Sequence, residues 1–153
     1  MRAVIQRVTS SKVTVDGKII GEIGVGLNVL LCAMQRDTEE DAQILAKKIA
    51  QLRIFSDEQG KMNLSITQVG GSILLISQFT LAADTRKGNR PSFTPAAEPQ
   101  TAKALYKRFA DLLHENSINQ VEMGVFGADM KVDIANDGPV TIMLDSKEWL
   151  KGE

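Results

Sequence analysis

Two polar clusters contain the residues whose types and spacing could do chemistry. The first runs over 77–93 and begins with Ser77-Gln78-Phe79-Thr80, where a predicted strand turns polar. Backbone N–H groups and hydroxyls at a strand end can contact a polar substrate atom. The cluster continues into a loop with three cations, Arg86, Lys87 and Arg90, which could bind phosphates. A strand end followed by a solvated loop would explain the same residues without any function.

The second cluster lies near the C-terminus and reads Asn136-Asp137-Gly138-Pro139-Val140-Thr141. Asn, Asp, Gly and Pro are the residue types that favour tight turns. Taken alone, this segment predicts a hairpin turn that joins two strands.

The familiar catalytic sets are missing from the sequence. His114 is the only histidine, and it lies at the predicted C-terminal end of a helix, where the helix dipole favours an imidazolium. The chain has no Gly-x-Ser-x-Gly elbow and no phosphate-binding Gly-x-x-x-x-Gly-Lys loop. It also has no Cys or His pair at zinc-ligand spacing. These observations argue against a triad hydrolase, a nucleotide-driven enzyme and a metallohydrolase, so we expect no metal and no cofactor.

The length of the chain suits a single hydrophobic core, so we expect one domain over residues 1–153 that contains both clusters. Apolar residues at helical spacing predict two helices, over 38–52 and from Pro99 onward. Strand patterns occur over 3–8, 12–15, 18–20, 27–33, 53–55, 72–81, 120–126, 130–135 and 140–145. We expect an α+β fold with a mainly antiparallel twisted sheet or partial barrel and two packed helices.

Charge and composition restrict the partners and the compartment. Eighteen Lys and Arg against 19 Asp and Glu give a net charge of −1, so any contact with a polyanion must be a local patch. Cys32 is the only cysteine and has apolar neighbours, which favours a buried residue in a reducing compartment. The charged N-terminus does not resemble an export signal, and the longest uncharged stretch, 62–83, is too polar to span a membrane. We expect a soluble cytoplasmic protein with no membrane partner.

Taken together, the motifs closely resemble those of the bacterial D-aminoacyl-tRNA deacylases, also known as the D-tyrosyl-tRNA deacylase family. The resemblance covers essentially the whole chain. In chain order it rests on Ala3-Val4-Ile5-Gln6-Arg7-Val8, Ser77-Gln78-Phe79-Thr80-Leu81, Arg86-Lys87-Gly88-Asn89-Arg90-Pro91-Ser92-Phe93 and Asn136-Asp137-Gly138-Pro139-Val140-Thr141.

The resemblance implies a homodimer that hydrolyses the ester between a D-amino acid and the 3′-terminal adenosine of tRNA, and that also cleaves glycyl-tRNA mischarged on tRNA(Ala). Residues 77–81 would line the pocket at the ester. The Gly138-Pro139 peptide would be cis and would reach into the pocket of the partner subunit, with Arg7 bracing it. Its carbonyls would reject the side chain of an L-amino acid, so selection would work by exclusion.

The resemblance leaves two catalytic readings open. Thr80 could be a nucleophile, although no base accompanies it in the sequence. Alternatively, the 2′-hydroxyl of the substrate could activate water while N–H groups around Phe79 and Thr80 stabilise the oxyanion, and we favour this reading. Phe79, Phe126 and Met130 are candidate walls for the terminal adenine, with core packing as the alternative. Arg86, Lys87 and Arg90 would contact phosphates of the acceptor stem.

Two other classes of function compete with this reading. A non-catalytic dimeric RNA-binding module could use the same basic loop, although aromatic residues, which such modules use for stacking, make up only 5% of the chain. A small-molecule amidase or esterase would lack an obvious base or metal. Hydrolysis assays on D- and L-tyrosyl-tRNA would separate the three.

Overall fold

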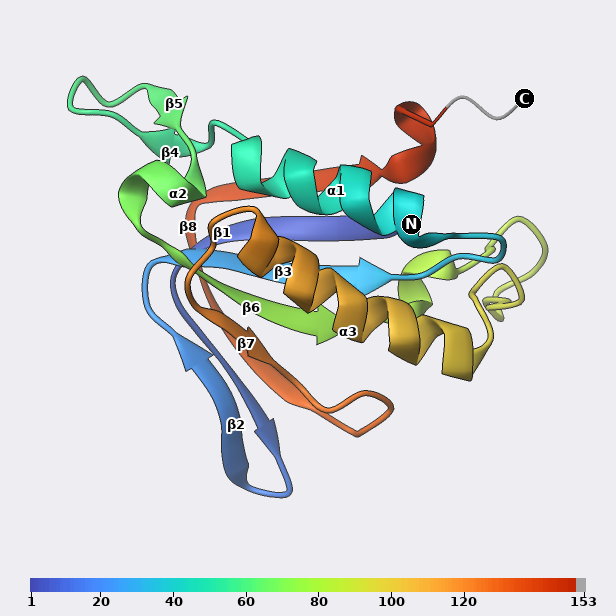
Figure 1. Cartoon of the computed structure of the whole chain (residues 1–153). Coiled ribbons are helices and arrows are strands. Elements are labelled where there is room, and N and C mark those ends of the chain that lie inside the picture. The colour runs from blue at the N-terminus through green and yellow to red at the C-terminus, as the bar shows by residue number, and fades with distance from the viewer. Residues whose placement is uncertain (151–153) are drawn as a thin grey trace.

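Two long strands form the centre of the fold. The computed structural model describes residues 1–150, and in it β1 (Arg2–Val15) pairs antiparallel with β8 (Lys131–Asp145) (Figure 1). On its other edge, the first half of β1 pairs with β3 (Gly26–Cys32) and the second half with β2 (Lys18–Ile23). All antiparallel pairs of the main sheet therefore involve β1.

Two parallel strands extend the sheet and curl it back on itself. β6 (Ser72–Ser77) pairs with β3, and β7 (Val121–Met123) pairs with β6, which gives the order β2-β1-β3-β6-β7 with β8 beside β1. The two ends of this order approach each other, because a Cβ placed on Gly21 of β2 would lie 3.2 Å from the carbonyl oxygen of Met123 in β7. The sheet is thus a partly closed barrel.

Two helices cover one face of the sheet and contact each other. They are α1 (Glu39–Gln51) and α3 (Pro99–Glu115) (Figure 1). α1 begins with a capping box, in which the N–H of Thr38 donates to Asp41 Oδ2 at 2.9 Å. The fully buried side chains between these helices and the sheet include Ile5, Leu27, Leu45, Ile49, Ile73, Leu75, Phe109 and Leu113.

A second apolar cluster fills the inside of the curled sheet. It consists of Val8, Val13, Ile23, Leu74 and Ile76, and Met130 packs against it. Both faces of β6 are therefore buried, which agrees with its nearly continuous apolar sequence.

Short elements form several of the connections. β4 (Phe55–Ser56) and β5 (Met62–Leu64) form a small hairpin, and α2 (Ile66–Val69) follows it. Single 3₁₀ turns, η1 (Phe79–Ala82) and η2 (Ser146–Glu148), follow β6 and β8. No helix within residues 1–150 combines the length and the apolar character that crossing a membrane would require.

The α+β fold with a partly closed sheet and two packed helices is confirmed. The sequence did not predict α2, because a four-residue helix is too short to show a periodic pattern. The predicted strand over 72–81 ends earlier, at Ser77, and continues as η1. Of the predicted domain over 1–153, residues 151–153 lie outside the described residues.

The hairpin turn predicted at residues 136–139 is wrong. β8 continues through this segment, and residues on both sides of it pair with β1, since Asn136 lies opposite Val8 and Thr141 opposite Gln6. Four residues of β8 therefore bulge out opposite the single residue Arg7. Turn-forming residues can make a bulge as well as a hairpin, and only the pairing with β1 distinguishes the two.

Candidate active site

A cavity of about 530 Å³ lies at the end of β6. It is bounded by this strand end, the start of α3 and the loop between β7 and β8. Five residues that the sequence predicts for the site line it together: Ser77, Gln78, Phe79, Phe126 and Met130. Residues 77–79 of the first cluster and two predicted walls, nearly fifty residues apart in sequence, thus meet around one hollow, whereas Thr80 and Leu81, also predicted for the pocket, do not line it.

The strand end is shaped by the change from β6 to η1. The N–H of Gln78 still donates to Leu31 O of β3 at 2.8 Å, whereas that of Leu81 turns back to Gln78 O at 3.2 Å. A 3₁₀ turn leaves its first N–H groups without carbonyl partners, and here these belong to Phe79 and Thr80. In the described chain neither donates to another backbone oxygen, so two donors are free beside the cavity.

Within the described residues, Gln78 is the only side chain that hydrogen-bonds to Thr80. Gln78 Nε2 donates to Thr80 Oγ1 at 2.6 Å, and a neutral amide cannot remove the hydroxyl proton. His114 lies fifteen residues beyond Pro99 on α3, which corresponds to about 22 Å along the helix. Its Nδ1 is 2.9 Å from Ile118 O. Neither Gln78 nor His114 is therefore a base for a Thr80 nucleophile, and the Asp129 carboxylate, which lines the cavity, makes no hydrogen bond to Thr80 within the described residues.

Two aromatic walls differ in how they are held. The Phe79 ring is 58% exposed and meets Phe93 edge-on, with the ring centroids 5.2 Å apart. Phe126 is half-buried, and its ring centroid lies 6.0 Å from that of Tyr106. The Tyr106 hydroxyl donates to Leu75 O at 2.7 Å, and burial raises the pKa of Tyr106 to about 12. Phe126 thus lines the cavity and contacts the core at once, while Phe79 is accessible to solvent.

Several small residues that the sequence does not mark as functional lie next to these walls. A Cβ on Gly124 would lie 2.6 Å from Met130 Sδ, so only glycine leaves Met130 its present place. Ala97, Pro99 and Ala102 form part of the opposite wall. The helical pattern had placed Ala102 on the buried face of α3, and no local signal marks any of these residues as functional.

The three cations of the basic loop lie around a second hollow, of about 580 Å³, which Asp84 and Ser92 also line. Arg86 is not free, since its Nε and Nη2 donate to the two Asp84 carboxylate oxygens at 2.9 and 2.6 Å. Hydrogen bonds from Arg86 lower the pKa of Asp84 to about 2. Among the described residues, no acidic side chain pairs with Lys87 or Arg90, so these two carry the uncompensated charge of the loop.

The Arg7 side chain is hydrogen-bonded to the bulge of β8. Its Nε donates to Asp137 O at 3.1 Å and its Nη1 to Ile54 O at 2.7 Å, and the side chain is only 11% exposed. The peptide bond between Gly138 and Pro139 is cis, and both residues are exposed. Gly138 has a φ of +124°, and a Cβ there would lie 2.9 Å from Arg7 Nη2. Glycine is therefore required at this close approach.

The bulge and the cavity of one chain lie apart. Arg7 pairs with Leu27 of β3, which pairs with Ile73 of β6. Ser77, at the cavity, is four residues further along β6, or about 13 Å. Neither Gly138 nor Pro139 lines the cavity of its own chain. The structure thus brings five predicted site residues together at the cavity and keeps the second cluster at a distance.

No metal-binding group is present in the part of the chain that the structure describes. Nowhere within residues 1–150 do three side chains of His, Cys, Asp or Glu come together as ligands. The cavity instead offers a backbone donor, the Gln78 amide, the Ser77 hydroxyl, the Asp129 carboxylate and apolar walls.

Sequence comparison links this arrangement to known proteins. The family model described as D-Tyr-tRNA(Tyr) deacylase matches residues 4–145. A D-aminoacyl-tRNA deacylase of Paracoccus denitrificans (strain Pd 1222) is 57% identical over 148 residues, which cover 97% of this chain and 99% of that relative. Another, of Clostridium beijerinckii (strain ATCC 51743 / NCIMB 8052), is 59% identical over 147 residues, 96% of this chain and 98% of the relative.

Solved structures share the fold. One, described as c-Myc DNA Unwinding Element Binding Protein, superposes with a TM-score of 0.90 at 42% identity and covers 95% of this chain and 98% of its own. A second, described as a probable eukaryotic D-amino acid tRNA deacylase, has a TM-score of 0.79 at 18% identity, with 94% and 98% covered. At that identity the second comparison supports the fold alone.

Proposed function

Because the chain belongs to the D-Tyr-tRNA(Tyr) deacylase family, we propose that it hydrolyses the ester bond of D-aminoacyl-tRNA. The observation that carries this proposal is the cavity at the end of β6, where two free N–H groups meet accessible aromatic and apolar walls. Donors of this kind can stabilise the oxyanion that forms when water adds to an ester carbonyl. The tRNA substrate also makes the cytoplasm the expected compartment.

In this proposal, the substrate supplies the catalytic base function. Thr80 has only an amide beside its hydroxyl, so we assign the activation of water to the 2′-hydroxyl of the terminal adenosine. Water adds to the ester carbonyl, the N–H groups of Phe79 and Thr80 hold the oxyanion, and the 3′-oxygen leaves with a proton. The products are a free D-amino acid and an uncharged tRNA. Positioning and oxyanion stabilisation suffice because an ester is already labile.

Chiral selection is assigned to the bulge of a partner subunit in a homodimer. The bulge is exposed, braced by Arg7 and remote from its own cavity, and these properties suit a segment that completes a neighbouring site. Met143 on the same strand is 77% exposed, which leaves apolar surface for a dimer contact. The carbonyls of Gly138 and Pro139 would collide with an L side chain, whereas a D side chain points away. Glycine has no side chain to reject, so glycyl-tRNA(Ala) is also a substrate.

The remaining substrate contacts are assigned by chemistry. Phe79, Phe126 and Met130 hold the terminal adenine through stacking and sulfur contacts. Lys87 and Arg90 bind acceptor-stem phosphates, and Arg86 contributes less because Asp84 already pairs with it. This patch provides a local cationic surface on a nearly neutral protein.

Rates of hydrolysis of D-tyrosyl-tRNA, L-tyrosyl-tRNA and glycyl-tRNA(Ala) test the proposal. We expect release of the amino acid from the D and glycyl esters and intact L ester under the same conditions. Binding of tRNA without release of any amino acid would instead support a non-catalytic nucleic-acid-binding module. One solved relative is described as a DNA-binding protein, so single-stranded DNA should be included as a competitor. Hydrolysis of simple esters but not of aminoacyl-tRNA would indicate a small-molecule esterase.

A further inference from the structure

A side chain from the first strand holds the turn that carries the two free donors. Arg2 of β1 donates from Nη1 to Leu81 O in η1 at 3.0 Å. The contact joins residues 79 apart in sequence, and its donor is charged, which makes such a bond stronger than a neutral one. Arg2 does not line the cavity but a neighbouring hollow, which Ala82 and Arg86 also line, so it contacts the turn from outside the cavity.

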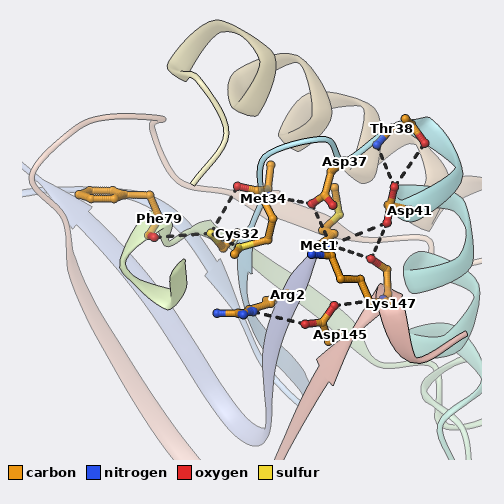
Figure 2. Close-up of polar contacts among 12 residues, drawn as sticks. Met1, Arg2, Cys32, Met34, Asp37, Thr38, Asp41, Phe79, Asp145 and Lys147 are labelled. Atoms are coloured by element: carbon orange, nitrogen blue, oxygen red, sulfur yellow. Dashed lines mark hydrogen bonds and ion pairs between the residues drawn. The ribbon is translucent and has the colours of Figure 1, made fainter. Parts of the chain in front are cut away.

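The guanidinium is held from its other side by the end of β8. Arg2 Nε lies 3.3 Å from Asp145 Oδ2, and Asp145 Oδ1 accepts a hydrogen bond from the N–H of Lys147 at 3.0 Å (Figure 2). Arg2 and Asp145 are also directly paired in the register of β1 and β8. The guanidinium that contacts η1 is therefore also held by β8, through Asp145.

The residue before Arg2 is anchored in the protein interior. The Met1 ammonium is fully buried and lies 2.8 Å from Asp37 Oδ2, and it donates to Ser146 Oγ at 2.6 Å (Figure 2). Ser146 Oγ in turn donates to Asp41 Oδ1 at 2.6 Å. This buried network makes the start of β1 a rigid base for the Arg2 side chain.

A second contact reaches the same turn from the neighbouring strand. Cys32 of β3 is the register partner of Arg2, and its Sγ lies 3.5 Å from Phe79 O (Figure 2). The thiol has one proton, which Ala33 O and Met34 Sδ can also accept, so the contact is weaker than that of Arg2. Two adjacent side chains thus lie against carbonyl oxygens of η1.

Carbonyl oxygens and N–H groups point in opposite directions along a helical turn. A donor that fixes the carbonyl end of η1 therefore also fixes the direction of the N–H groups at its start. We propose that Arg2 is a positioning residue, which holds Leu81 O and so aims the N–H groups of Phe79 and Thr80 at the ester. This inference rests on the proposed deacylase function, and it extends that function to a residue outside the cavity.

Steady-state kinetics on D-tyrosyl-tRNA with two variants test the inference. Arg2→Met keeps the length of the side chain but removes every donor, and we expect kcat to fall by about tenfold with KM unchanged. Arg2→Lys keeps a charged donor and should restore most of kcat. A purely structural role would not separate kcat from KM in this way. Arg2→Met with the kcat of the wild type would overturn the proposal, and so would a change confined to KM, which would make Arg2 a substrate contact.

Arg53→Met is the matched control. Arg53 Nε donates to Asn63 O at 3.1 Å, so this variant also removes an arginine–carbonyl bond, but one remote from the cavity. We expect its kcat to equal that of the wild type. Asp145→Asn leaves the Leu81 contact in place and removes only the ion pair, so its loss of kcat should be smaller than that of Arg2→Met.

Amide hydrogen exchange tests the contact independently of activity. The N–H groups of Leu81 and Ala83 donate to Gln78 O and Thr80 O at the two ends of η1, and their exchange reports the opening of this turn. We expect both amides to exchange faster in Arg2→Met than in the wild type, and at the wild-type rate in Arg53→Met. Equal exchange in all three proteins would contradict the inference. If the wild type failed to cleave D-tyrosyl-tRNA, the deacylase proposal would fall, while exchange would still report whether Arg2 holds the turn.

Discussion

The cavity at the end of β6 and the bulge at residues 137–140 differ in what holds them and in what they offer a substrate. The cavity is built on core strands, and it presents free N–H donors and apolar walls. The bulge is exposed, and it presents carbonyl acceptors held by Arg7 and by the hydrogen bond from Val140 N to Asn136 Oδ1. In the proposed function each region provides what the other lacks, since the cavity is assigned to stabilise the reacting ester and the bulge to reject one enantiomer. We therefore expect that catalysis and selection can be disturbed separately.

The largest expected effect concerns the cavity and is obtained by changing the substrate. A D-aminoacyl-tRNA that ends in 2′-deoxyadenosine lacks the hydroxyl assigned to activate water, so kcat should fall by about 10²-fold or more. Binding should persist, because the phosphates and the adenine are unchanged. Single-turnover hydrolysis together with a filter-binding assay measures both quantities.

Thr80→Val provides the complementary protein variant. It removes the hydroxyl at nearly constant volume, and we expect substantial residual activity, since the proposed function assigns the backbone N–H of Thr80, not its hydroxyl, to catalysis. An acyl-enzyme trapped on Thr80, or normal turnover of the deoxy substrate, would refute the assignment of catalysis to the 2′-hydroxyl.

The next effect concerns the bulge. Gly138→Ala places a Cβ 2.9 Å from Arg7 Nη2 at a φ of +124°, so the free energy of unfolding should decrease by about 1–3 kcal/mol. The displaced carbonyls should also lower the ratio of D to L hydrolysis, by about tenfold. Urea denaturation and paired hydrolysis assays measure the two changes.

Gly60→Ala is the control for backbone strain alone. Gly60 has a φ of +78°, and a Cβ there would have no atom within 4 Å. It should lose stability without losing chiral selectivity. If both variants kept the selectivity of the wild type, the bulge would have no part in choosing the enantiomer.

A smaller effect is expected at the adenine wall. Gly124→Ala would place a Cβ 2.6 Å from Met130 Sδ, and because this sulfur ends a flexible side chain, Met130 should shift into the cavity. KM should rise by about 2- to 10-fold through the lost sulfur contact, with D-over-L selectivity unchanged. Gly24→Ala, where a Cβ has open space, should behave as the wild type in the same kinetic assay. A change in selectivity in Gly124→Ala would show that cavity and bulge are not independent.

The smallest effect is expected in the basic loop. Lys87→Gln and Arg90→Gln should each reduce the salt dependence of tRNA binding by about one unit of slope. Arg86→Gln should change it less, because the Asp84 carboxylate has a pKa of about 2 and stays paired with Arg86 at any assay pH above that value. Asp84→Asn should release Arg86 and strengthen binding. If all four variants had the salt dependence of the wild type, the loop would make no contact with tRNA phosphates.

Local sequence was sufficient for α1 and α3 and for the polar strand end at residues 77–80. The apolar stripes of α1 and α3 follow from helical spacing, and the capping box at Thr38 and Asp41 lies within a single turn. The polar run over 77–80 could also be recognised from the sequence, because it directly follows an apolar strand and the change in polarity is visible in neighbouring residues. These features depend on residues within a few positions of one another, so the sequence by itself determined them.

Tertiary structure alone decided how distant segments meet. The residues at 136–139 suit a hairpin or a bulge equally well, and only pairing with β1, more than a hundred residues away, made them a bulge. The same holds for the contacts of Arg2 with Leu81 and of Phe126 with Tyr106, which join segments far apart in the sequence. Such contacts depend on strand register and on the curl of the whole sheet, because both are set by the summed packing of the core rather than by any one segment.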